Sequence, residues 1–273
     1  MKRMGFYLVV AALLLYALFP FYWAINTSLK PAAQISALPV QYLPLPPSFE
    51  AYASVLANPI FLRGLLNSVL VAVLTTALSL MAGSLAAYAL ARFTFRGRRP
   101  VLYLILAMTT FPQIAVVGAL FRMITAAGLF NTPMALVITN MLTTLPFTVW
   151  VLTSFFRTLP RELEEASYVD GASTWQTLWH VMLPLTAPGF VTTALLAFIS
   201  CWNEYLFALS FTEDQRARTA TVVVAQFSGE MSYEVPFGQI MAGGLITTLP
   251  LIVLVLVFQR RIVSGLTAGA IKG

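Results

Sequence analysis

The stretch LLNSVLVAVLTTALSLMAGSLAAYAL, residues 65–90, contains no charged side chain and decides how the rest of the chain is interpreted. A helix needs about 20 mostly apolar residues to cross the hydrocarbon core of a bilayer, which is roughly 30 Å thick. Five other stretches meet the same requirement, so the sequence predicts an all-α membrane protein with six transmembrane helices. The predicted spans are residues 6–25, 65–90, 101–121, 134–156, 185–211 and 240–258. We expect one transmembrane domain covering residues 1–273.

The composition of the 273-residue chain supports this class. It is 59% hydrophobic and only 10% charged, whereas soluble domains carry roughly 25% charged residues. So few charges would leave large apolar patches on the surface of a soluble protein of this size. His180 and Cys201 are the sole histidine and cysteine, so a His/Cys metal cluster and an internal disulfide are both excluded. We expect no metal and no cofactor in this chain.

Lysine and arginine residues set the expected orientation, because cytoplasmic loops carry an excess of them. With the N-terminus inside, the inner segments hold eleven of the sixteen basic residues. These are Lys2, Arg3, Arg92, Arg96, Arg98, Arg99, Arg157, Arg161, Arg260, Arg261 and Lys272, against Lys30, Arg63, Arg122, Arg216 and Arg218 outside. The sequence therefore predicts that both termini are cytoplasmic. The basic cluster at residues 92–99 is interpreted as an anchor at the inner surface, with binding of lipid phosphate left open.

Two longer stretches interrupt the apolar pattern on the predicted outer side. Residues 30–63 contain six prolines, so we expect an extended segment with little regular structure. Residues 212–239 carry several charged side chains of both signs. Neither stretch is expected to form a folded domain.

The most informative segment is the predicted inner loop RTLPRELEEASYVDGASTWQTLWHVMLP, residues 157–184. Pro160 stands where a helix would begin, and three glutamates follow in its first turns, which suits the positive end of a helix dipole. Gly171 is placed to end that helix in the left-handed conformation.

A second helix is expected after this glycine. Ser173 and Gln176 form a capping-box pattern, and we expect the helix to cover residues 174–183 and to end at Pro184. A compact helix–glycine–helix element of this kind favours docking on another protein. A helix pair that rests on lipid headgroups is the alternative left open.

The loop resembles the EAA loop of ABC importer permeases. The residues that carry the resemblance are Glu165-Ala166-Ser167, Gly171, and Val181-x-Leu183-Pro184. The stretches WNEY at residues 202–205 and GLTAGAIKG at residues 265–273 are similar to those of the carbohydrate-uptake family, specifically the smaller permease of maltose- and trehalose-type importers.

The resemblance implies a permease subunit of an ATP-driven importer in the plasma membrane of a bacterium or archaeon. The cargo would be a sugar, such as an α-linked di- or oligosaccharide of the maltose or trehalose type. ATP and Mg would be bound by a separate dimer of ATP-binding subunits, and this chain would not be an enzyme. A second homologous permease, an extracytoplasmic sugar-binding protein and membrane lipid would complete the partners, with no nucleic acid.

The resemblance also implies roles for individual positions. Coupling to the ATPase is expected at Glu164, Glu165, Ala166, Ser167, Asp170, Gly171, Leu183 and Pro184. The tail would contact the ATPase through Gly265, Leu266, Thr267 and Lys272. The sugar-binding protein would contact Gln226, Phe227, Ser228 and Gly229. Candidates for the substrate path are Trp202, Asn203, Glu204 and Tyr205.

Glu204 is the one acidic residue inside a predicted span, and an intramembrane carboxylate indicates a functional site by default. Its place near the predicted outer end of the span also permits a structural or interfacial role. Two other functions remain open at this stage. One is the permease of another ABC import class, and the other is an ion-coupled secondary transporter, for which Glu204 would be the sole intramembrane acid.

Overall fold

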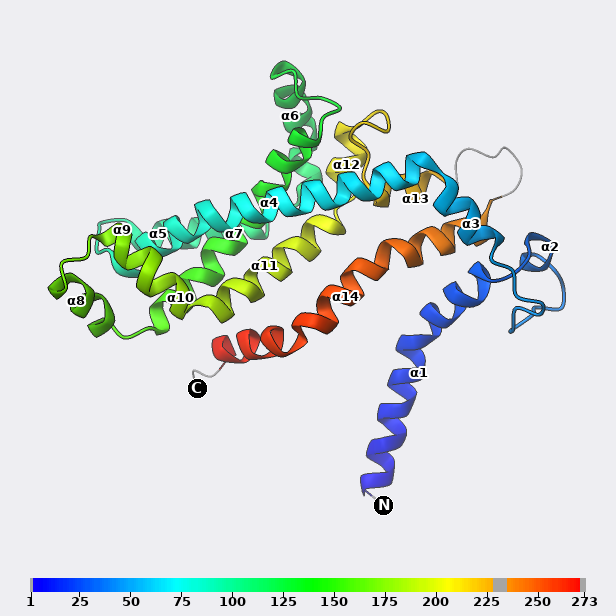
Figure 1. The fold of residues 1–273 in the computed structure, drawn as a ribbon, viewed down its shortest axis with the longest axis horizontal. Helices are drawn as coiled ribbons and strands as arrows, with labels where there is room; N and C mark the ends of the chain where they lie inside the picture. Colours follow the sequence, from blue (N-terminus) through cyan, green and yellow to red (C-terminus); the bar gives the residue numbers. More distant parts are fainter. Residues whose placement is uncertain (1, 228–234, 271–273) are drawn as a thin grey trace. The chain divides into compact units, whose positions relative to one another are not determined.

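The computed structural model describes residues 2–227 and 235–270, and within these ranges the regular structure is helical, without a strand (Figure 1). The prediction of an all-α protein is therefore confirmed. The chain forms two compact units, each described here by itself. Unit 1 comprises Met1–Leu65 and Ala220–Pro250, and unit 2 comprises Leu66–Thr219 and Leu251–Gly273.

Four helices of the described ranges are long and apolar enough to cross a membrane without interruption. They are α1 (Lys2–Ser28), α4 (Pro59–Arg92), α7 (Pro133–Thr158) and α14 (Phe237–Ala270). Each of these continuous helices covers one of the predicted spans, at residues 6–25, 65–90, 134–156 and 240–258. With a rise of about 1.5 Å per residue, the 34 residues of α4 give a helix of roughly 50 Å, which extends beyond the hydrocarbon core.

The predicted span at residues 101–121 is wrong as a single helix. The chain instead forms α5 (Arg98–Thr109) and α6 (Gln113–Ala126), which meet at 94°. Pro112 causes the break, because it has no backbone N–H to donate and disfavours a helical conformation at Phe111. The two helices meet the requirement for a span only when they are taken together.

The predicted span at residues 185–211 is also interrupted. Its main part is α11 (Ala187–Trp202), and a turn separates α11 from the short α12 (Leu206–Phe211). Before α11, the chain bends by 79° between the helical segment Thr174–Leu185 and α11 itself.

The expectation of an extended segment at residues 30–63 is wrong in part, since unit 1 contains α2 (Ala32–Ile35) and α3 (Glu50–Ala57) there. The stretch EAYASVLA of α3 has no proline or glycine, and it buries Val55 in the core of the unit with Phe61, Val223 and Ala242. Residues 220–226 of the other outer stretch form α13 (Ala220–Gln226).

In unit 2, α4 and α7 approach each other closely. A Cβ atom added at Gly83 would lie 2.6 Å from Cγ2 of Thr148, so the small residue is required for this approach. One turn away, the hydroxyls of Ser79 and Thr144 share a buried hydrogen bond of 2.8 Å. Together with α11, which packs along α7, these helices form the core on which the inner loop rests.

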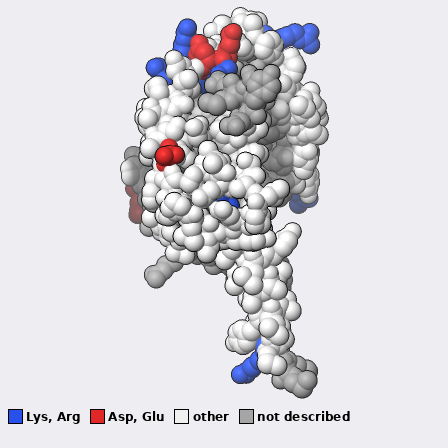
Figure 2. All heavy atoms as spheres, turned by 90° about the vertical axis from the view of Figure 1, so that its right-hand side faces the viewer, with Lys and Arg blue, Asp and Glu red and all other residues white. Residues whose placement is uncertain are grey.

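Apolar side chains dominate the surface. Most of the face drawn in Figure 2 is free of charged residues. Nearly all side chains of α1 from residue 3 to residue 22 are exposed, Tyr16 for example by 84%. This surface matches a chain that lies in lipid or against other subunits.

Candidate functional site

The first half of the inner loop is α8 (Glu162–Val169), which ends at a glycine corner. Gly171 has a φ of +84°, a conformation that side chains with a Cβ rarely adopt. Its N–H donates to the carbonyl of Tyr168, and the N–H of Ala172 donates to the carbonyl of Ser167 over 2.9 Å. This is the hydrogen-bond pattern of a Schellman motif, so the predicted helix end at Gly171 is confirmed.

The second half starts as predicted but continues further. Ser173 and Gln176 form a complete capping box at the start of α9 (Thr174–Thr177). A π-helical turn, η1 (Leu178–Met182), and α10 (Leu183–Leu185) follow without a break. The predicted helix end at Pro184 is therefore wrong. The wider π turn immediately before Pro184 makes room for its ring, and the chain bends at Thr186 instead.

The inner face of α8 is tied to the spans by a buried ion pair. Nε of Arg92, the last residue of α4, lies 3.5 Å from Oε2 of Glu164, and the two side chains are only 5% and 11% exposed. Arg92 also donates from Nη2 to the carbonyl of Leu159 over 2.9 Å. Both groups are shielded from water, so removing one would leave the other charged and unpaired.

Further contacts hold α8 against the second half of the loop and the spans. Ser167 Oγ donates to the carbonyl of Glu164 and shares a hydrogen bond of 2.8 Å with Thr177 Oγ1. Leu178 and Met182 of η1 are buried in the core of unit 2 beside Tyr88 and Phe156. The loop is thus joined to the transmembrane helices by both polar and apolar contacts.

The loop lies at the end of unit 2 that is distant from α12 (Figure 1), and the face of the loop that points away from the spans is exposed. Val169 is 88% exposed, and Tyr168, Trp175 and Trp179 are also exposed apolar or aromatic side chains. An exposed apolar knob with an acidic rim is typical of a surface that docks on another protein.

The eight predicted coupling residues differ in burial. Glu164 and Ser167 are buried and bond within the chain. The exposed members are Glu165, Ala166, Asp170, Gly171 and Pro184, while Leu183 is half-buried. Only the exposed group is free in this chain to meet a partner directly.

The four predicted substrate-path residues lie at the turn between α11 and α12. Trp202 is 2% exposed and stacks on Phe198, whereas Asn203 and Tyr205 are exposed. The carboxylate of Glu204 accepts hydrogen bonds from the N–H groups of Phe207 (2.7 Å) and Ala208 (3.0 Å). Glu204 therefore caps the first turn of α12, whose free N–H groups are its partners.

The remaining predicted contacts are only partly described. In unit 1, Gln226 ends α13, and the ring of Phe227 lies 6.1 Å from that of Phe61. Ser228, Gly229 and Lys272 lie outside the described residues. Gly265, Leu266 and Thr267 belong to α14, but their side chains are not described.

The sequence analysis did not identify the residues that hold α8 and the second half of the loop against the spans. These are Arg92, Thr177, Leu178 and Met182. Arg92 was predicted only as part of the basic anchor at residues 92–99. The one sequence feature that distinguishes it is that it is the first charged residue after the span at residues 65–90. Leu178 and Met182 are spaced four residues apart, a helical interval that indicates one buried face.

Comparison with known proteins gives the family. Residues 79–267 match the family described as "Binding-protein-dependent transport system inner membrane component". The trehalose/maltose transport system permease protein MalG of Thermococcus litoralis is 44% identical, over 97% of this chain and 96% of that protein. The trehalose transport system permease protein SugB of Mycobacterium tuberculosis is 40% identical, over 100% and 99%.

A solved bacterial ABC transporter involved in the import of the acidic polysaccharide alginate contains a chain of similar fold. The TM-score is 0.82 at 25% identity, covering 95% of this chain and 97% of that chain. The chain therefore belongs to the family of binding-protein-dependent transport system inner membrane components. It is a membrane-spanning transport permease of the ABC importer class and not itself an enzyme.

Proposed function

We propose that this permease imports an α-linked di- or oligosaccharide, such as maltose or trehalose, driven by ATP that a separate pair of subunits hydrolyses. The names of the relatives at 40% and 44% identity support the sugar class. The observation that carries the ATP-driven mechanism is the two-sided inner loop, with one face fixed to the spans and the other exposed.

In this mechanism, the ATP-binding subunits bind the exposed face of α8 and close on ATP and Mg. Glu165 and Asp170 supply the charged contacts, and Val169 supplies the apolar one. The ion pair of Glu164 with Arg92 passes the displacement of α8 to α4. Leu178 and Met182 pass it to the packed core. The spans then rock between outward and inward openings. The tail at residues 265–273 is proposed as a second ATPase contact.

The substrate path is proposed to run past the turn between α11 and α12. Backbone that leaves a helix at membrane depth is tolerated where it is buried in protein or lines a water-filled cavity. Asn203 and Tyr205 are exposed at this turn and offer an amide and a phenol to sugar hydroxyls. In this arrangement Glu204 positions α12 and does not bind a coupling ion, because its oxygens already accept hydrogen bonds from two backbone N–H groups.

The same proposal sets the orientation and the partners. Both termini and the α8 loop face the cytoplasm of a bacterium or archaeon, as the distribution of basic residues predicts. A sugar-binding protein docks on the outer side around residues 226–229, and a second, homologous permease completes the membrane part.

Purification and reconstitution test this function. We expect the chain, purified from its native membrane in mild detergent, to bring with it an ATP-binding subunit and a different permease. In proteoliposomes with the binding protein, we expect uptake of labelled trehalose or maltose only when ATP is present. Cellobiose, a β-linked glucose disaccharide, is the matched control and should not enter. Uptake driven by an ion gradient without ATP would contradict the proposal.

A further inference from the structure

Tyr88 lies near the end of α4 that meets the inner loop, one helical turn before Arg92, and it is only 3% exposed. Its ring packs edge-on against Phe156 of α7 and against Phe93, with ring centroids 5.8 Å and 5.7 Å away. Such edge-to-face contacts have a preferred geometry, so they restrict the orientation of the ring. The ring therefore fixes where the hydroxyl of Tyr88 lies.

This hydroxyl belongs to a buried polar cluster with Arg92 and Glu164. It lies beside the side chains of Glu164 and Tyr168, close enough to interact with both. Yet Tyr88 Oη, Arg92 Nε and Glu164 Oε1 form no well-aligned hydrogen bond among the described residues, although all three atoms are buried. Arg92 Nε and Glu164 Oε2 are 3.5 Å apart, which is longer than a charge-assisted hydrogen bond of about 2.7–2.9 Å. The cluster thus holds suitable donors and acceptors that have not closed on one another.

A small movement of α8 would close the cluster. A buried polar atom without a hydrogen bond has lost its water and gained no partner, which destabilises the open arrangement. Moving α8 toward α4 by roughly 0.6 Å would shorten the contact of Arg92 with Glu164 to a normal hydrogen bond. It would also bring the free oxygen of Glu164 to the hydroxyl of Tyr88. A protein that docks on the exposed face of α8 pushes the helix in this direction, because Glu164 is on the buried face.

We propose that Tyr88 is a positioning residue of the transport cycle, whose hydroxyl donates to Glu164 when α8 is pressed against the spans. This inference rests on the proposed coupling of α8 to an ATP-binding subunit. Tyr168 is 44% exposed on α8 and lies beside the same hydroxyl, so the contacts extend from the docking face to α4. Closure of the cluster of Tyr88, Arg92 and Glu164 stabilises the docked position of α8 and passes its movement to α4.

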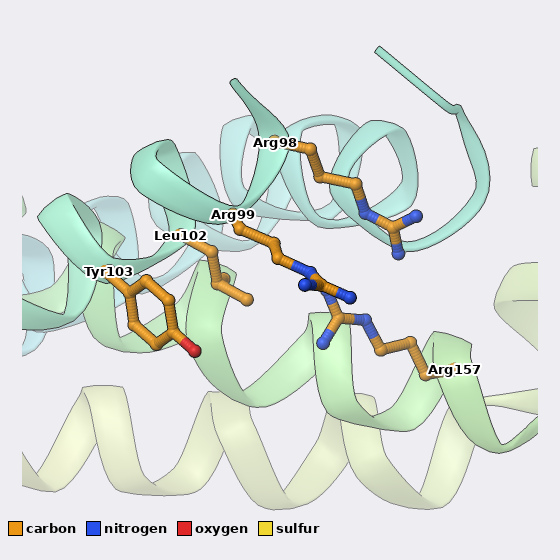
Figure 3. A pocket seen from close by; sticks show the side chains of 5 residues that line it. All are labelled: Arg98, Arg99, Leu102, Tyr103 and Arg157. Atoms are coloured by element: carbon orange, nitrogen blue, oxygen red, sulfur yellow. The ribbon is translucent and has the colours of Figure 1, made fainter. Parts of the chain in front are cut away.

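Tyr88→Phe tests this role, because it keeps the ring and removes only the hydroxyl. The variant and the unaltered transporter, each purified with the ATP-binding subunits, are compared in proteoliposomes by the number of sugars imported per ATP hydrolysed. Thermal unfolding of the same preparations is measured with and without a non-hydrolysable ATP analogue. Tyr103→Phe is the matched control, because Tyr103 is on another helix, α5, and is 65% exposed. Figure 3 shows Tyr103 in a pocket that it lines with Arg98, Arg99, Leu102 and Arg157.

We expect Tyr88→Phe to lower the number of sugars imported per ATP about tenfold, the effect of one lost hydrogen bond to a charged group. ATP is then hydrolysed without moving the spans. Without nucleotide, the unfolding midpoint should not fall, because the hydroxyl makes no well-aligned hydrogen bond in that state. The rise in midpoint on binding the analogue should be smaller than in the unaltered transporter. Tyr103→Phe should match the unaltered transporter in all three measurements.

Two results would overturn the role of Tyr88. One is an unchanged number of sugars per ATP together with an unchanged response to the analogue. The other is a lower midpoint without nucleotide, with uptake and ATP hydrolysis reduced in proportion, which would assign the hydroxyl to folding alone. If the unaltered transporter imported no sugar with ATP, the proposed function would fail, whereas the response to the analogue would still decide the role of Tyr88.

Discussion

Glu164 is buried and Glu204 is half-buried, and the two carboxylates find their partners in opposite ways. Glu164 pairs with Arg92, which is 72 positions earlier in the sequence and on another helix. Glu204 accepts hydrogen bonds from backbone N–H groups only three and four residues ahead. The first contact joins the inner loop to a span, whereas the second only restarts a helix. The comparison suggests that Glu164 transmits force and that Glu204 shapes a turn.

The largest effect is expected from the long-range pair. Glu164→Ala leaves Arg92 charged and unpaired in a buried position, which should lower the free energy of unfolding by about 3 kcal/mol. Denaturant titration of the purified transporter measures this change. In a double-mutant cycle, Arg92→Ala combined with Glu164→Ala should cost less than the sum of the two single changes. Additive losses would show that the two side chains do not depend on each other.

A smaller effect is expected at the corner that aims α8. Gly171→Val places a β-branched residue at a φ of +84°, at a cost of about 2 kcal/mol. We expect α8 to shift and sugar uptake to fall roughly tenfold, while the chain still inserts into the membrane. Gly128→Val is the matched control, because Gly128 has a φ of +70° in another loop with open space around it. Equal losses of uptake in both variants would contradict the claim that the glycine corner after α8 has a specific role in transport.

The smallest effect is expected at the local contact. Glu204→Ala removes the acceptors for two N–H groups of α12 and should cost about 1 kcal/mol of stability. Glu213→Ala removes an exposed acid just beyond the end of α12 and should leave stability unchanged. Both can be compared by thermal unfolding in the same detergent. Abolition of ATP-driven uptake by Glu204→Gln at unchanged stability would contradict a purely structural role.

The features that were predicted correctly from the sequence are those that depend on residues close together in the chain. Uninterrupted apolar length gave the four continuous spans, and local patterns gave the Gly171 corner and the Ser173 capping box. Pro112 lies inside the predicted span at residues 101–121, and a proline can end or kink a helix there. Because transmembrane helices tolerate proline where neighbouring groups satisfy the backbone, its position alone does not establish a break.

Contacts between distant residues could not be predicted in this way. Nothing near Glu164 in the sequence distinguishes it from Glu165, yet one is buried against Arg92 and the other is exposed. The π turn before Pro184 likewise depends on burying Leu178 and Met182 against α4 and α7. The predicted set of coupling residues was therefore a mixture of buried and exposed side chains, which only the packed structure separates.

Cross-linking from the exposed tip of α8 tests most directly whether the inner loop docks on the ATPase. Val169→Cys introduces a thiol at a position that is 88% exposed, and the native Cys201 is buried. Leu38→Cys, at a position 87% exposed in the predicted outer stretch, is the matched control. With a thiol-attached photocrosslinker on the purified transporter, we predict an adduct between the ATP-binding subunit and Cys at 169, and none from 38. An adduct of that subunit with the position 38 variant alone would contradict the assignment of α8 as the coupling element.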